Sequence, residues 1–397
     1  MTFTIQQVLR PLLVARFFIG LGVYPTKQSK LKIQWIKYLS TAYTLTIWIV
    51  HGCLFYYVLS LFTINVLFRS TTHKIIVVIN ILTTIISVIM SLYYQKNFET
   101  CMNKLALVND TLEKLGTPKM YQKMHVWSKW MVIGWIVYSL VLNCYDTIWW
   151  INQKETASWG LYLSHIFNYN IHINAFVDLL FIFFLWYVGT RFEKVNEHMQ
   201  CLLINKDHEI RCTWKKPVIT FHRYTSYIDN YKQILWISIH LHLEICRIAR
   251  EINLMFGTQM TFEIISYLFF VTILCFKSYF FVTRGIGEEI LLSITYGFRR
   301  GLWIVVILMR LYIINYMCEN VKLKANKIDI VIHHLTNTLR YADVWKEVHQ
   351  FILQGIHRPL KFTGMGLFYF GNVFLQKFCT TMVTFMIILV QMVKFPD

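Results

Sequence analysis

The sequence predicts an all-α membrane protein with seven transmembrane helices, a cytoplasmic N-terminus, an extracellular C-terminus and long amphipathic cytoplasmic helices. The chain has 397 residues, of which 56% are hydrophobic and only 15% are charged. Its mean hydropathy is +0.46. Because a soluble domain carries about 25% charged residues, this composition favours a polytopic membrane protein over a soluble enzyme or a disordered chain.

Seven stretches are apolar enough to cross a bilayer, which requires about 20 mostly apolar residues per helix. The predicted spans are 40–62, 75–94, 130–151, 164–189, 259–283, 300–319 and 372–393. All six prolines lie outside the cores of these spans. The first span begins too far from Met1 to be a signal peptide.

The distribution of basic residues sets the predicted orientation. Segments 1–39, 95–129, 190–258 and 320–371 hold 29 of the 39 Lys and Arg residues, whereas the four alternate segments hold 6. Cytoplasmic loops are enriched in Lys and Arg, so the first set is predicted to lie inside the cell. None of the nine cysteines falls in a predicted extracellular loop, so we expect no extracellular disulfide.

The long cytoplasmic segments are predicted to be helical, because their apolar residues recur every three or four positions. Packing within the chain and contact between subunits explain this pattern equally well. The predicted organisation is a cytoplasmic N-terminal segment (1–39), six spans (40–319) with a cytoplasmic helical extension (190–258), further cytoplasmic helices (320–371), a seventh helix (372–393) and an extracellular tail (394–397).

The C-terminal end of the chain resembles the insect gustatory receptors. That family ends with Thr-Tyr, five hydrophobic residues and Gln-Phe. Here Thr384-Phe385 precedes five hydrophobic residues and Gln391-Met392, so Thr384 and Gln391 match while Phe385 and Met392 are conservative departures. The segments 357–368 and 253–257 are also similar to that family.

The resemblance implies a taste receptor that acts as a ligand-gated, non-selective cation channel subunit and is opened by a small-molecule tastant. It implies a tetramer, formed with itself or with related gustatory receptors, in the plasma membrane of chemosensory neurons. Segment 320–371 would anchor the seventh helix, which would line the pore. The implied pore and gate residues are Thr381, Thr384, Ile388, Gln391 and Met392.

The spacing of residues in the seventh helix is compatible with a pore. Lys377, Thr381, Thr384, Ile388 and Gln391 form one polar-rich stripe on an otherwise apolar helix. Polar groups in hydrocarbon are costly unless they face water or a partner. The stripe is therefore compatible with a helix that lines a water-filled pore. From the residues alone, however, hydrogen bonding between packed helices is the favoured interpretation.

Aromatic and polar residues in the outer halves of the spans suggest a ligand pocket. Aromatic walls with a few polar groups suit sugars or alkaloid-like cations, although each residue alone also fits the interfacial belt of Trp and Tyr. Asp178 and Arg310 lie at similar depth and could pair. The pocket candidates are Asp146, Trp149, Trp150, Tyr169, Asn170, Tyr279 and Trp303.

Other classes of function have less support from the residues. The sequence contains no nucleophile elbow, P-loop or metalloprotease motif, so we expect no enzyme, cofactor or metal. The net charge of +18 comes without long Lys/Arg runs, so we expect no nucleic-acid partner. The alternatives are a metabotropic seven-helix receptor, which has the opposite orientation, and a transporter, which usually carries internal repeats.

Overall fold

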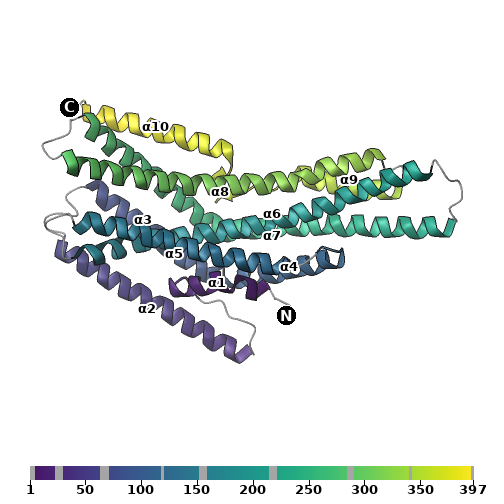
Figure 1. The fold of residues 1–397 in the computed structure, drawn as a ribbon, viewed down its shortest axis with the longest axis horizontal. Coiled ribbons are helices and arrows are strands. Elements are labelled where there is room, and N and C mark those ends of the chain that lie inside the picture. The colour runs from purple at the N-terminus through teal and green to yellow at the C-terminus, as the bar shows by residue number, and fades with distance from the viewer. Residues whose placement is uncertain are drawn as a thin grey trace.

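The computed structural model is an elongated bundle of α-helices (Figure 1). It describes residues 5–22, 30–62, 71–117, 120–151, 159–213, 221–283, 290–338 and 342–394. Within these ranges the chain forms ten helices and one hairpin of two short strands.

Six of the seven predicted spans each lie within one helix, and the remaining one, 75–94, ends one residue beyond α3 (Thr71–Tyr93). Six helices are long and apolar enough to cross a membrane, and α3 adds a seventh when it is joined to α4 (Gln95–Lys114) across a 60° bend. The predicted all-α, seven-span class is therefore confirmed, and the chain is a multi-pass membrane protein. The other spans lie in α2 (Lys30–Phe62), α5 (Tyr121–Ile151), α6 (Gly160–Thr213), α7 (Phe221–Thr283), α8 (Ile290–Thr338) and α10 (Asn372–Lys394).

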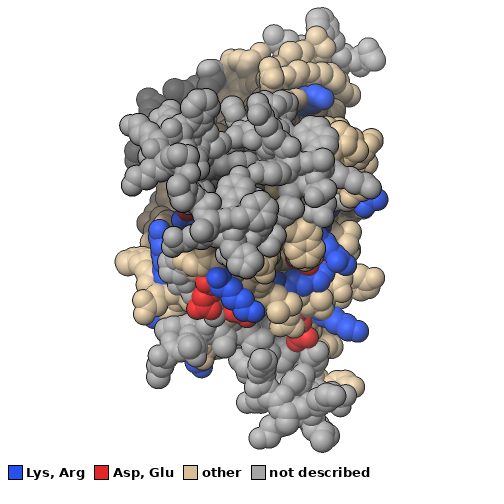
Figure 2. Space-filling view, turned by 90° about the vertical axis from the view of Figure 1, so that its right-hand side faces the viewer, with Lys and Arg blue, Asp and Glu red and all other residues tan. Residues whose placement is uncertain are grey.

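The helices continue beyond the predicted spans, because hydropathy marks only the part of a helix that lies in hydrocarbon. Segments 190–213, 221–258 and 320–338 extend α6, α7 and α8, and together with α9 (Ala342–His357) they form what we call the distal bundle. This bundle occupies the right-hand end of Figure 1. Viewed from that end, Lys and Arg side chains are spread over the described part of the face, with Asp and Glu among them (Figure 2).

Helix α6 forms the centre of the molecule. It packs against α5, α7 and α8, and also contacts α2 and α3. Its buried aromatic side chains include Phe176, Phe181, Phe184 and Phe192. Because each aromatic ring buries about 150–250 Å², these residues account for much of the central packing. The short helix α1 (Ile5–Phe18) lies along α5 and buries its own apolar face there.

A small hairpin joins α9 to α10. Its strands β1 (Thr363–Gly364) and β2 (Phe368–Tyr369) pair antiparallel. The backbone N–H of Thr363 donates to Asn253 Oδ1 on α7 at 3.0 Å, and Asn253 Nδ2 donates to Thr363 Oγ1 at 3.3 Å. The N–H of Gly371 donates to Asn315 Oδ1 on α8 at 2.9 Å. The hairpin is therefore attached to α7, and the residue just before α10 is attached to α8.

This attachment brings together the two upstream segments that resemble the gustatory receptors, 253–257 and 357–368. In addition to the Asn253 contacts, a Cβ placed on Gly257 would lie 3.0 Å from the carbonyl oxygen of Thr363. A glycine at this position lets the hairpin approach the surface of α7 closely.

Candidate functional site

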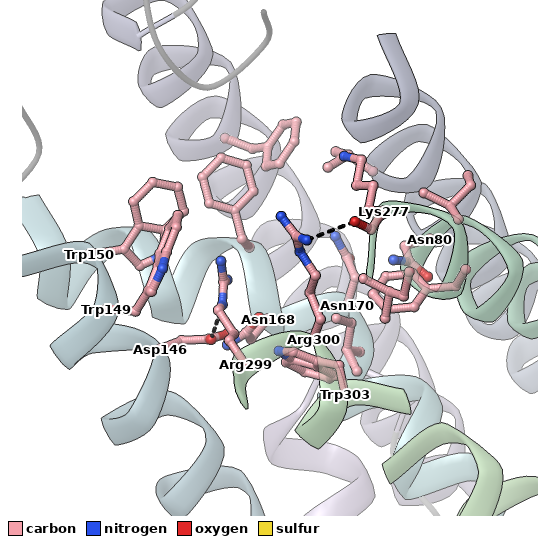
Figure 3. Close-up of a pocket in the computed structure, with 17 residues that line it drawn as sticks. Asn80, Asp146, Trp149, Trp150, Asn168, Asn170, Lys277, Arg299, Arg300 and Trp303 are labelled. Atoms are coloured by element: carbon pink, nitrogen blue, oxygen red, sulfur yellow. Dashed lines mark hydrogen bonds and ion pairs between the residues drawn. The ribbon is translucent and has the colours of Figure 1, made fainter. Parts of the chain in front are cut away.

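A pocket of about 230 Å³ lies among six helices (Figure 3). Aromatic rings form much of its wall and several polar side chains point into it, a composition that suits a small organic ligand. Its lining residues are Phe55 from α2; Val77 and Asn80 from α3; Asp146, Trp149 and Trp150 from α5; Phe167, Asn168, Asn170 and Ile171 from α6; Phe270, Ile273, Leu274 and Lys277 from α7; and Arg299, Arg300 and Trp303 from α8.

Five of the seven predicted pocket residues line this cavity, namely Asp146, Trp149, Trp150, Asn170 and Trp303. The other two lie elsewhere. The Tyr169 ring lies 4.6 Å from the His51 ring, and its hydroxyl donates to the carbonyl of Ile19 at 3.2 Å. The ring of Tyr279 lies beside Phe280. The α6 residues 167, 168, 170 and 171 line the cavity, and at about 100° per residue Tyr169 falls on the opposite face of that helix.

An ion pair and a stacked guanidinium form one side of the pocket. Arg299 Nε donates to Asp146 Oδ1 at 2.9 Å, and the Asp146 side chain is only 2% exposed. The guanidinium of Arg299 lies 3.8 Å from the centroid of a Trp149 ring. The pairing neutralises the buried carboxylate, while the cation–π contact positions the indole.

A chain of amide groups continues from Asp146 towards the interior. Asn168 Nδ2 donates to Asp146 Oδ2 at 2.8 Å and to Asn143 Oδ1 at 3.2 Å. A ring nitrogen of His172 lies 2.9 Å from the same Asn143 oxygen. These hydrogen bonds hold Asp146 in one orientation, while His172 Nδ1 is buried without a hydrogen-bond partner among the described residues.

Sequence reasoning missed Arg299 and Arg300, which lie about three turns into α8. Arg300 Nη1 donates to the backbone carbonyl of Lys277 at 3.0 Å, beside the pocket (Figure 3). The predicted span began at 300, so Arg299 was placed in a loop, whereas α8 begins at Ile290. The four-residue spacing of Arg299 and Trp303 puts them on one helix face, which is the signal that could have identified them.

A second polar cluster lies deeper among the helices. Arg310 Nη2 lies 2.6 Å from Asp178 Oδ2 and 2.6 Å from Glu263 Oε1. The hydroxyl of Tyr267 contacts the same two carboxylate oxygens, at 3.1 and 2.5 Å. The structure thus joins Asp178 and Arg310 as a pair and adds Glu263, which sequence reasoning overlooked.

The predicted pore residues all lie on α10, the most exposed of the candidate membrane helices. Only 6% of the most apolar stretch of α10 is buried, compared with 78% for α6. Ile388 and Met392 are 44% and 69% exposed, and Thr381, Thr384 and Gln391 are also exposed. The hydroxyls of Thr381 and Thr384 donate to carbonyls one turn earlier, so the helix itself satisfies them.

An open groove of about 720 Å³ lies between α7, α8, the hairpin and the first turns of α10. Lys377 lines this groove together with Lys322 and Lys361, and Thr381 lies at its edge. Lys322 Nζ pairs with Glu319 Oε1 at 3.1 Å. Lys377 therefore belongs to a basic groove near the hairpin, far along α10 from Gln391.

Comparison with known proteins identifies the family. The profile described as 7tm chemosensory receptor matches residues 9–394. A Drosophila melanogaster protein described as gustatory receptor 28b is 23% identical over 309 residues, covering 74% of this chain and 63% of that protein. The chain therefore spans less than two thirds of the length of that relative.

Solved structures share the fold. The olfactory receptor OR5 of the insect Machilis hrabei matches with a TM-score of 0.65 at 14% identity. The structure of the same receptor in complex with eugenol matches with a TM-score of 0.61 at 15% identity. Both comparisons cover 98% of this chain and 97% of the other. From the profile match over nearly its whole length, the chain belongs to the 7tm chemosensory receptor family.

Proposed function

We propose that this protein is a taste receptor subunit that forms a ligand-gated, non-selective cation channel in the plasma membrane of chemosensory neurons. The pocket lined by Asp146, Trp149 and Trp303 binds a small-molecule tastant. Four subunits, of this chain alone or with related receptors, surround a pore lined by α10. The single observation that carries the proposal is the placement of α10, which is highly exposed in the monomer yet attached, through the hairpin and Gly371, to two helices of the pocket.

The exposure of α10 supports an oligomer. Its buried face contacts α7 and α8, and it includes Phe378 with Phe374 and Met382. The stripe of Thr381, Thr384 and Gln391 is left outside this contact. Four copies of that stripe around a common axis would give these polar groups a wet environment and would relieve their cost in hydrocarbon.

The charge distribution supports a cytoplasmic N-terminus. The four segments predicted to be cytoplasmic hold 29 of the 39 Lys and Arg residues. In this orientation the distal bundle lies in the cytoplasm, and the pocket opens towards the extracellular side. A tastant reaches the pocket from outside without crossing the bilayer.

The proposed coupling runs through α7 and α8. Phe270 and Lys277 of α7 and Trp303 of α8 line the pocket. The same two helices hold the hairpin and the residue just before α10 through Asn253 and Asn315. A ligand that binds the open arrangement more tightly shifts the closed–open equilibrium towards it. Motion of α10 then widens the constriction formed by Gln391 and Met392, where a hydrophobic ring can gate by dewetting.

The decisive experiment is electrophysiology on cells that express the full chain, alone and with related receptors, exposed to a panel of tastants. The proposal predicts an inward cation current evoked by at least one tastant in cells with verified surface expression. Tags at the two ends test orientation, because only a C-terminal tag should be reached by antibody on intact cells. Stoichiometric solute uptake without current, or an externally accessible N-terminal tag, would refute the proposal.

A further inference from the structure

A second, smaller cavity lies beneath the ligand pocket, and we call it the lower chamber. It has a volume of about 20 Å³, which is room for one water-sized occupant. Four of its lining residues, Asn80, Ile171, Phe270 and Trp303, also line the pocket above. The two cavities are therefore neighbours that share a wall.

The floor of the lower chamber carries an excess of negative charge. Asp178 and Glu263 are both paired with the single guanidinium of Arg310. The Tyr267 hydroxyl contacts both carboxylates, but its one proton can be donated to only one of them at a time. Among the described charged groups at this site, two carboxyl groups thus face one cation, and ionisation of both leaves one negative charge without a partner. An uncompensated charge at this depth in a membrane protein is costly.

One oxygen of Glu263 is available to an occupant. Glu263 is only 1% exposed and lines the chamber. Its Oε1 is used by Arg310 and Tyr267, whereas its Oε2 is buried without a hydrogen-bond partner among the described residues. A buried carboxylate oxygen left in this way needs a proton, a donor or a cation.

The other polar groups of the chamber also present oxygen. Asn80 Oδ1 accepts from the Ser266 hydroxyl at 3.2 Å, and Asn174 Oδ1 accepts from the Ser87 hydroxyl at 3.1 Å. Each of these amide oxygens retains a second lone pair. No group of three His, Cys, Asp or Glu in the described ranges could hold a metal ion. One carboxylate with amide and hydroxyl oxygens is instead a set that suits a hard cation of low charge.

We propose that the lower chamber binds one small monovalent cation, held by Glu263 with oxygen atoms of Asn80, Asn174 and Ser266. One positive charge balances the two carboxylates and Arg310, and a cation near the size of water fits the available space. The site lies among α3, α6, α7 and α8, whereas the proposed pore is lined by α10, so the site is separate from permeation. Binding of the cation to this site depends neither on channel activity nor on a bound tastant.

The test is thermal unfolding of the purified full-length protein in detergent. NaCl is compared with N-methyl-D-glucamine chloride at equal ionic strength, because N-methyl-D-glucamine is too large for the chamber. A ligand that binds only the folded state stabilises it, so Na⁺ should raise the unfolding temperature by a few degrees and the effect should saturate. Glu263→Gln removes the charge and should abolish the Na⁺-dependent rise. Glu251 lies in the distal bundle, where its carboxylate pairs with Lys104 of α4. The control variant Glu251→Gln should therefore retain the Na⁺-dependent rise.

Unfolding temperatures of the unmodified protein in chloride salts of cations of increasing size test the proposal even if Glu263→Gln does not fold. Li⁺ and Na⁺ should stabilise the protein more than K⁺, and Cs⁺ should have no effect. Equal unfolding temperatures in all salts would overturn the proposal, and they are the outcome expected if Glu263 is protonated or a water fills the chamber. An undiminished Na⁺ effect in folded Glu263→Gln would overturn it as well. Absence of tastant-evoked current would leave this site unaffected.

Discussion

Arg310 and Asp178, which lie 132 positions apart in the chain, are joined by two hydrogen bonds among the buried helices. Arg310 Nε and Nη2 donate to Asp178 Oδ2 at 2.9 and 2.6 Å. Because Glu263 accepts from the same guanidinium, this arginine links α8 to both α6 and α7. Helices α6, α7 and α8, which all contribute residues to the lining of the ligand pocket, are thereby held together at one point.

Replacing Arg310 tests this link. Arg310→Leu leaves two buried carboxylates without their cation, so the free energy of unfolding should fall by about 3–5 kcal/mol. The measurement is the unfolding temperature of the purified protein, with surface expression as a second readout. Arg247→Leu is the matched control, because Arg247 is 66% exposed and its pairing with Glu251 should contribute less than about 1 kcal/mol. Equal losses in the two variants would contradict the assigned role of Arg310.

The stacked arginine of the pocket should affect tastant potency. Arg299→Gln removes the cation–π contact with Trp149 and the charge opposite Asp146. Loss of about 1.4 kcal/mol of binding free energy corresponds to about a tenfold higher half-maximal tastant concentration. Tyr279→Phe is the control, since Tyr279 lies outside the pocket lining, and its dose–response curve should not move. The pocket assignment fails if the two variants behave alike at equal surface expression.

The amide of Gln391 should influence conduction and not folding. Gln391→Ala alters an exposed side chain near the end of α10. We expect the half-maximal tastant concentration or the relative permeability of cations to change by about twofold or more, with unchanged surface expression. Cys379→Ala, also exposed on α10 but off the polar stripe, should behave as the unmodified chain does. Unchanged gating and permeation in Gln391→Ala would count against α10 as the pore helix.

The glycine that precedes α10 should be intolerant of a side chain. Gly371 has a φ of +143°, and a Cβ there would meet the carboxylate of Glu319. Gly371→Ala should therefore destabilise the protein by about 1–2 kcal/mol through backbone strain, with a smaller addition because the flexible Glu319 side chain must move aside. Gly116→Ala provides the comparison, because Gly116 has a φ of +90° but open space around its Cα. Thermal unfolding of the two variants separates the steric effect from the backbone effect.

Acid should destabilise the distal bundle through His242. Its ring lies between Phe192 and Phe351, and burial, with a smaller effect of Arg250, lowers the pKa of His242 to about 3. Since the folded-state pKa lies below the unfolded value of about 6.5, stability is complete above about pH 6.5 and falls as the pH drops towards the folded value. The loss from this group is about 2 kcal/mol at about pH 5.

The variant His242→Phe keeps an aromatic ring between the two phenylalanines but cannot take up a proton. Its free energy of unfolding should therefore depend less on pH between about pH 6.5 and pH 5 than that of the unmodified protein. Chemical or thermal unfolding at several pH values measures the difference. Parallel pH profiles for the two proteins would show that His242 does not titrate with unfolding.

Much of the fold could be predicted because its signals are local. Hydropathy over about 20 residues locates each span, and apolar spacing locates the helical extensions. The aromatic pocket residues Trp149, Trp150 and Trp303 were also found from depth and type alone. The residues that were missed, such as Arg299 and Glu263, lie at or near the ends of the predicted spans, where a charged side chain looks like part of a solvated loop.

The sequence by itself determined the number of membrane spans, their approximate bounds and the family resemblance carried by the end of α10. Only the tertiary structure decided which side chains meet. It turned Tyr169 away from the pocket and placed Arg299 over Trp149. It also joined Asp178, Glu263 and Arg310. The physical reason is that helical periodicity specifies the direction of a side chain about its own axis, whereas the rotation and depth of one helix against another are set by packing of the whole core.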